Sequence, residues 1–161
     1  MDNNIYAPPK ADIQDMELQT RQHGDLAGFW RRFTASFIDG ILIVLVTIPL
    51  SYLYFGPAYF DENTPTFFGP VDFIINYILP FIIVIAFWKI KSATPGKMLL
   101  GIKIIDAKHG GQPSTGQFIG RYLGYILSTV VIFLGYFWML WDKRKQTWHD
   151  KLASTLVVRT R

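Results

Sequence analysis

The sequence predicts an all-α membrane protein built from a transmembrane helical hairpin, a third apolar helical segment and a small β element. Half of the 161 residues are hydrophobic and only 17% are charged, against about 25% in an ordinary soluble domain. Three long apolar stretches interrupt the chain, and all sixteen Lys and Arg residues lie outside residues 33–88. Bases that cluster at the ends of apolar stretches are typical of membrane helices and set their orientation.

Residues 1–26 are expected to form a flexible polar tail in the cytoplasm, because they hold Pro8, Pro9 and no hydrophobic period. Residues 27–161 then form one membrane domain. The chain has no cysteine, which excludes disulfides and thiolate chemistry. The distribution of the bases, rather than the net charge of +4, argues against nucleic acid as a partner and for the lipid bilayer.

The first span is predicted over residues 33–55, whose 23 residues suffice to cross a hydrocarbon core of about 30 Å. The loop of residues 56–71 carries acids and prolines but no base, so it should face outward. A second span over about residues 72–88 ends in Lys89, Lys91 and Lys97. The two spans predict a hairpin with both ends, and the N-terminus, in the cytoplasm.

The connector after the hairpin begins with Thr94-Pro95, an N-cap followed by proline at the first helical position, and Gly101 is expected to stop this short helix. Residues 102–106 predict a strand. Residues 155–159 predict a second strand suited to pair with it, which requires both strands to lie on one side of the membrane. The β element is therefore expected at the cytoplasmic face.

The third apolar segment, residues 117–141, is open to two paths. Residues 122–141 are uncharged and long enough to cross, but crossing would place the basic C-terminal tail outside, against the positive-inside rule. A kink near Gly135 and a return would keep the tail in the cytoplasm, and the strand pair favours this path. Re-entrant backbone is tolerated only where protein or a cavity covers it.

Asp39 is the candidate functional residue, because a carboxylate within a membrane helix costs about 2.5–3.5 kcal/mol and is kept mainly for a partner or an ion path. Arg32 lies two turns earlier on nearly the same face. Arg121 and Lys89 are further possible counter-ions, and Ser36 is a nearby polar group. Two interpretations stay open: a structural ion pair between helices, or a carboxylate that binds H⁺ or Na⁺.

Small residues recur every fourth position on the third segment and predict close helix packing, within the monomer or between subunits of a homo-oligomer. They are Gly116, Gly120, Gly124 and Ser128. The stripe Ala35, Ser36 and Gly40 is their expected partner surface. The bases Lys143, Arg144 and Lys145 are candidates for binding anionic lipid head groups.

The remaining polar residues predict no enzyme. The three histidines lie far apart, so we expect solvated loop positions and no metal site, and no cofactor motif or catalytic set is present.

Three blocks in order resemble the RDD family of bacterial membrane proteins, named for one arginine and two aspartates. The first block is AGFWRRFTASFIDGILI, the second SATPGKMLLGIKIIDAKHGGQPSTGQFIGRYLG and the third WDKRKQTWHDKLASTLVVR. The resemblance places the arginine at Arg32, with Arg31 as the adjacent option, and the first aspartate at Asp39. The second aspartate is assigned to Asp150, with Asp142 and Asp106 as alternatives. Further motif positions are Thr94, Pro95, Gly96, Lys97, Gly101, Asp106 and His149, while Ser154 departs from a usual glycine.

The resemblance implies a bacterial cytoplasmic (inner) membrane protein suspected of transport, with cation/proton antiport as the most concrete suggestion. Proton-coupled transport of a small cation through Asp39 is therefore the leading prediction. The alternative is a non-transporting scaffold or lipid-binding module, in which the arginine and aspartate are structural.

Overall fold

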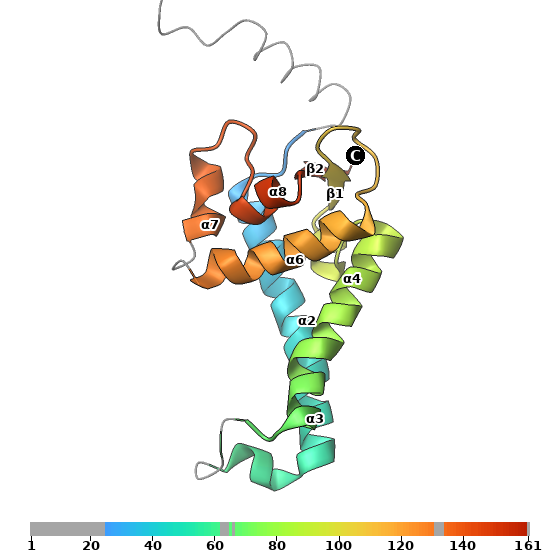
Figure 1. The fold of residues 1–161 in the computed structure, drawn as a ribbon, viewed down its shortest axis with the longest axis vertical. Coiled ribbons are helices and arrows are strands. Elements are labelled where there is room, and N and C mark those ends of the chain that lie inside the picture. Colours follow the sequence, from blue (N-terminus) through green and yellow to red (C-terminus); the bar gives the residue numbers. More distant parts are fainter. Residues whose placement is uncertain (1–24, 62–64, 66, 131–133, 161) are drawn as a thin grey trace, which may run out of the picture.

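The computed structural model describes residues 25–61, 65, 67–130 and 134–160. Two long helices form a hairpin, drawn as the two upright rods of Figure 1. The first is α2 (Phe29–Phe55), which contains Pro49 and ends at Gly56, where φ is +71° and the N–H donates to the carbonyl of Tyr52. The predicted tail lies almost wholly outside the described residues.

The second rod is a continuous run over Pro70–Lys91, composed of α3 (Pro70–Phe73), the π-helix η2 (Ile74–Ile78) and α4 (Leu79–Lys91). Pro80 lacks a backbone N–H, and its ring crowds the carbonyl four residues earlier, so the turn before it widens. Both rods have a mean hydropathy of 2.1, and only 11% and 17% of their most apolar windows are buried within the protein. Most of their surface is therefore left for lipid.

The short 3-10 helix η1 (Pro57–Phe60) follows α2 at the turn of the hairpin. We call this end of the hairpin the loop end. The opposite end carries α5 (Pro95–Leu99) and the antiparallel strands β1 (Ile102–Asp106) and β2 (Thr155–Arg159), in the register Ile102↔Arg159 to Asp106↔Thr155. We call it the sheet end. The predicted pairing of the two strands is confirmed.

The third apolar segment is bent, as the return path requires. It comprises α6 (Thr115–Val130), α7 (Leu134–Phe137) and the 3-10 helix η3 (Trp138–Leu140). The axis of Leu134–Leu140 is turned by 114° from that of Thr115–Thr129, and α6 runs across the two rods at the sheet end (Figure 1). The last helix, α8 (Trp148–Leu152), leads into β2, so the C-terminal strand lies at the same end as β1.

The hydrophobic core sits at the sheet end, where the rods, α6 and the strands meet. Trp88 of α4 is 1% exposed and lies 5.7 Å from the ring of Phe118 of α6. The core is completed by Ala27, Ala35, Ile102, Ile104 and Val157. The chain before α2 also joins the sheet, because Ala27 N–H donates to the Val157 carbonyl at 2.9 Å. The predicted fold class, a helical hairpin with a bent third segment and a small β element, is confirmed.

Candidate functional site

A buried charge cluster links three distant parts of the chain. Asp150 of α8 is fully buried and lies between the guanidinium groups of Arg32 of α2 and Arg121 of α6. Arg32 Nη1 donates to Oδ2 at 2.5 Å, and Arg121 Nη1 donates to Oδ1. One carboxylate thus holds two cations, because each of its oxygens accepts from a different guanidinium.

Local structure fixes Asp150 in this place. It is the third residue of α8 and accepts a hydrogen bond from the backbone N–H of the N-cap residue Thr147 at 3.1 Å, the reciprocal contact of a capping box. Burial by itself raises the pKa of Asp150, but Arg121 and Arg32 outweigh burial and hold the pKa well below its usual range. Asp150 is therefore a permanent anion.

Backbone carbonyl and hydroxyl groups accept further hydrogen bonds from the two guanidinium groups. Arg32 Nε donates to the Ala27 carbonyl at 3.1 Å, and Nη2 lies 3.4 Å from the Val157 carbonyl. Arg121 Nη1 also donates to the Thr155 hydroxyl at 2.6 Å. The cluster thus ties α2, α6 and α8 to the edge of the sheet, which is the structural role of a buried ion network.

Asp39 forms a second, separate contact, between α2 and α5. It accepts hydrogen bonds from the Thr94 hydroxyl and from the Gly96 N–H, the latter at 2.7 Å, and Lys97 Nζ lies 3.7 Å away. A Cβ at Gly96 would clash with the Ala35 carbonyl and lie 2.9 Å from Asp39 Oδ1. The TPGK motif thus places a hydroxyl, the backbone N–H of a glycine and an ammonium group around one carboxylate.

The expected counter-ions of Asp39 were wrong. Arg32 and Arg121 both bind Asp150. The cation at Asp39 is Lys97, which was expected as a base after the second span and as a motif residue but not as a counter-ion. Lys89 is exposed in the last turn of α4. Ser36 is exposed on α2 and lines the cavity described below.

The expectation that the histidines lie in solvated loops was wrong for His149. Its ring is buried, with Nε2 2.7 Å from the Thr147 hydroxyl and Nδ1 3.4 Å from the Ser128 hydroxyl. Burial lowers the pKa of His149 well below its usual value, and Arg121 acts in the same direction. His149 is thus a neutral packing residue, while His109 is exposed and His23 lies outside the described residues.

The predicted partner of the small-residue ridge on α6 was also wrong. A Cβ at Gly124 would lie 2.8 Å from His149 Cβ, and one at Gly135 would lie 2.6 Å from Ser128 Oγ. The ridge therefore packs against α8 and α7 rather than against the small stripe of α2. Gly120 has open space around it, and the nearest atom to a Cβ at Gly116 is the Ser114 hydroxyl.

Asp106 and Gly101 have local roles at the ends of β1. Asp106 accepts from the backbone N–H groups of Lys108 and His109 and from the Gln117 side chain. Burial acts to raise the pKa of Asp106, but these hydrogen bonds outweigh it and lower the pKa to about 2. Gly101 has φ +59°, a conformation that favours glycine after a helix.

A polar cluster at the loop end was not foreseen. Asp72 is 4% exposed and accepts from the Asn76 side chain at 2.7 Å, the Tyr59 hydroxyl at 3.2 Å and the Phe68 N–H at 3.4 Å. Asn76 also reaches Ser51 of α2 at 3.4 Å. These contacts fasten the turn of the hairpin. The sequence signal was an acid at the start of a span with no base in residues 33–88.

A cavity of about 490 Å³ opens beside the Asp150 cluster, between α2, α6 and α7. Arg32, Lys97 and Arg121 line it, together with His149 and a set of aromatic side chains. Among the described residues around it, no carboxylate forms part of the wall. The described residues contain no group of three His, Asp or Glu side chains that could hold a metal ion.

Comparison with known proteins agrees with the residue pattern. The model of the RDD family matches residues 26–154. The uncharacterized protein YxaI of Bacillus subtilis is 31% identical over 147 residues, which cover 82% of this chain and 96% of that protein. The uncharacterized membrane protein YteJ of the same organism is 28% identical over 97% of this chain and 90% of its own length. The uncharacterized protein RP437 of Rickettsia prowazekii is 34% identical over 61% of this chain and 54% of its own length. No solved structure gives a significant match. Arg32, Asp39 and Asp150 all take part in the two charged contacts described above. Because the family model covers most of the chain, the chain belongs to the RDD family.

Proposed function

We propose that the protein is a non-enzymatic module of the bacterial inner membrane that engages the anionic lipids of one leaflet, with its arginine and aspartate residues as structural ties. The observation that carries this proposal is the apolar outer face of the bent third segment. The large hydrophobic residues that α6 exposes are Ile119, Leu123, Ile126 and Leu127. After the bend, Leu134 of α7, Trp138 and Leu140 of η3, and the following Trp141 are exposed as well.

The position of this face supports insertion into a single leaflet. The first part of the segment, α6, lies across the rods at the sheet end instead of running beside them (Figure 1). Trp141 is 74% exposed, and the exposed bases Lys143 and Lys145 follow it two and four residues later. An apolar face flanked by tryptophan and bases is typical of interfacial segments, and each base near an anionic surface contributes about 1 kcal/mol.

Charge supports a cytoplasmic sheet end, and with it a cytoplasmic N-terminus. Lys89, Lys91 and Lys143 cluster there, whereas residues 33–88, which include the whole loop end, hold no base. The homo-oligomer expected from the sequence stays a prediction. Gly124 and Ser128 of the small-residue ridge already pack within the monomer, so this part of the ridge is not open to a second subunit.

Lipid selectivity in vesicles tests the proposal. The protein is reconstituted in mixtures of spin-labelled phosphatidylglycerol and phosphatidylcholine, and the motionally restricted fraction of each is measured. We expect a preference for phosphatidylglycerol that falls with salt and falls further in Lys143→Gln/Lys145→Gln. The matched control is Lys103→Gln/Lys108→Gln, two exposed bases on the strand and turn of the sheet end. Equal restriction of both lipids by the wild type would contradict the proposal.

Proton-coupled transport of H⁺ and Na⁺ through Asp39 is the second candidate. The observation in its favour is the 3.7 Å separation between Asp39 and Lys97, looser than the contact between Asp150 and Arg32. In this scheme protonation of Asp39 releases Lys97, and a cation replaces the proton. We rank it second because a hydroxyl and a backbone N–H also occupy the carboxylate.

Flux in everted vesicles separates the two candidates. Na⁺, K⁺ and Li⁺ are added in turn to energised vesicles that contain wild type or Asp39→Asn at equal levels. Collapse of the pH gradient by one cation, lost in the variant, would establish the transport scheme. The lipid-module proposal expects no collapse with any cation.

A further inference from the structure

The cavity between α2, α6 and α7 carries a charge that the described residues in contact with it do not balance. Its wall holds the cations Arg32, Lys97 and Arg121. The carboxylates in contact with them are Asp150, shared by both arginines, and Asp39, near the lysine. Three cations therefore face two anions, which leaves one excess positive charge among buried side chains. A charge excess of this kind is costly away from water unless an anion approaches it.

One of these cations also has an unused donor. Arg121 is 1% exposed, and its Nε has no hydrogen-bond partner among the described residues. A buried guanidinium N–H without an acceptor forfeits a charge-assisted hydrogen bond. Both the charge excess and this free donor point to an anionic ligand with oxygen acceptors.

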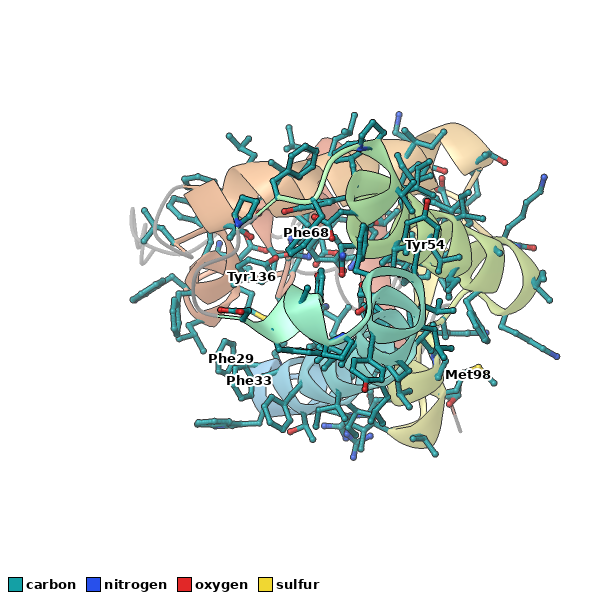
Figure 2. All side chains as sticks on the ribbon, turned by 90° about the horizontal axis from the view of Figure 1, so that it is seen from below. Phe29, Phe33, Tyr54, Phe68, Met98 and Tyr136 are labelled. Carbon is teal, nitrogen blue, oxygen red and sulfur yellow. The ribbon has the colours of Figure 1, made fainter. Side chains whose placement is uncertain are left out.

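The rest of the wall is suited to hydrocarbon. Phe29 and Phe33 of α2 line the cavity with Tyr136 and Phe137 of α7. Figure 2 shows Phe29, Phe33 and Tyr136 on the same side of the molecule, and the rings of Phe29 and Phe137 stack with centroids 5.6 Å apart. Phe33 is 54% exposed, so the aromatic wall continues into the surface that α2 presents to lipid.

A cation-lined interior beside an aromatic wall that reaches the bilayer matches an amphiphile rather than a small soluble ion. The volume of about 490 Å³ lies within the range of ligand pockets, about 300–1,000 Å³. The cavity lies at the sheet-end start of α2, the level at which head groups of the adjoining leaflet are expected.

We propose that this cavity binds the head group of an anionic phospholipid from the surrounding leaflet, with its phosphate oxygens at Arg121 and Lys97 and its acyl chains leaving between α2 and α7. The inference rests on the proposed lipid-engaging function and deepens it, because it assigns one specific lipid to an internal site apart from the surface bases Lys143 and Lys145.

The test uses the full-length protein in a zwitterionic detergent, with the melting temperature and native mass spectrometry as readouts. The probes are phosphatidylglycerol, phosphatidylcholine and inorganic phosphate. Ser36→Trp fills the cavity from α2 without removing a charge, and Thr34→Trp is the control, because Thr34 is exposed on the same helix and lines a different depression. Lys97→Gln removes one cation, and Lys97→Arg restores it.

We expect phosphatidylglycerol alone to raise the melting temperature and to remain bound in the gas phase. Its apparent affinity should fall about tenfold or more in Ser36→Trp and Lys97→Gln, while Thr34→Trp and Lys97→Arg should stay near wild type. Stabilisation by inorganic phosphate as large as that by the lipid would overturn the lipid as occupant. Retention of lipid binding in Ser36→Trp together with its loss in Lys143→Gln/Lys145→Gln would overturn the cavity site and leave the proposed function standing. Absence of any phosphatidylglycerol preference in the wild type would overturn both.

Discussion

Replacement of Asp150 by asparagine is the perturbation to which the fold should be most sensitive. Asp150 is fully buried and bound by Arg32, Arg121 and the Thr147 N–H. Asparagine has the same shape, but it is neutral and offers one acceptor oxygen where the carboxylate offers two. Its NH₂ group would therefore face one of the guanidinium groups, and neither group could accept a hydrogen bond from the other. Two cations would also be left in the interior without a counter-charge.

The expected magnitude follows from that uncompensated charge. Removing one partner of a buried ion pair costs about 3–5 kcal/mol, and two arginines depend on Asp150. We expect Asp150→Asn to lose at least about 3 kcal/mol of unfolding free energy, measured by chemical denaturation in mild micelles. Asp25→Asn is the control, because Asp25 is exposed and it is its backbone carbonyl that accepts a hydrogen bond from the Arg159 N–H.

A double-mutant cycle tests the reasoning behind that magnitude. In the Asp150→Asn background, Arg121→Met should cost less than it does in the wild type, because it removes a cation that has already lost its partner. A loss below about 1 kcal/mol in Asp150→Asn, or strict additivity in the cycle, would refute the idea that Asp150 compensates both arginines.

Three further predictions follow from the same contacts. Gly96→Ala should destabilise the protein by about 1–3 kcal/mol, because its Cβ would collide with the backbone of α2. Gly120→Ala, at a position with open space around it, should show no loss of unfolding free energy in the same denaturation assay. Equal effects of the two substitutions would count against close packing at Gly96. Asp39→Asn should lower the free energy of unfolding by about 1–3 kcal/mol, less than Asp150→Asn, because the remaining side-chain oxygen can still accept a hydrogen bond from α5. A larger loss than in Asp150→Asn would show that Asp39, and not Asp150, is the more important contact for stability. His149 has a folded-state pKa well below the unfolded value of about 6.5. Below that pH the unfolded state gains a proton at His149 while the folded state does not. The free energy of unfolding should therefore fall as the pH drops from about 6.5, by at most about 1.4 kcal/mol per pH unit. Melting curves across pH 5–8 should show this slope in the wild type and not in His149→Gln, and an unchanged slope in the variant would contradict it.

The local elements could be predicted because each has its own signal. The hairpin follows from apolar length and from the absence of bases, and the short connector helix follows from Thr94-Pro95. The two strands were predicted from short apolar runs, and their pairing in turn favoured the return of the third segment. Gly135 marks the bend, since its missing side chain lets α7 approach Ser128.

The partners of the charges could not be predicted in the same way. Arg32 and Asp39 share a helix face at a spacing of two turns, but Arg32 reaches Asp150, 118 positions along the chain. That contact exists only because β2 pairs with β1 and carries α8 back to the start of α2. A usable signal was present in Thr147-x-x-Asp150, a capping-box spacing that fixes Asp150 at a helix start. Spacing within one helix reports which side chains share a face, and tertiary structure decides which of them meet.

The difference between the two aspartates bears on how an acid within a membrane helix should be interpreted. Asp39 was singled out because a carboxylate in a span is costly, yet its oxygens face a hydroxyl and the N–H at the start of α5, where the helix dipole also favours negative charge. Such contacts recover much of the desolvation cost without any ion. Asp150, which lies outside the spans, is the carboxylate on which two buried cations depend. Among the described residues at the aromatic-walled cavity, three cations contact two carboxylates, and this excess of positive charge is the reason that we propose an anion as its ligand.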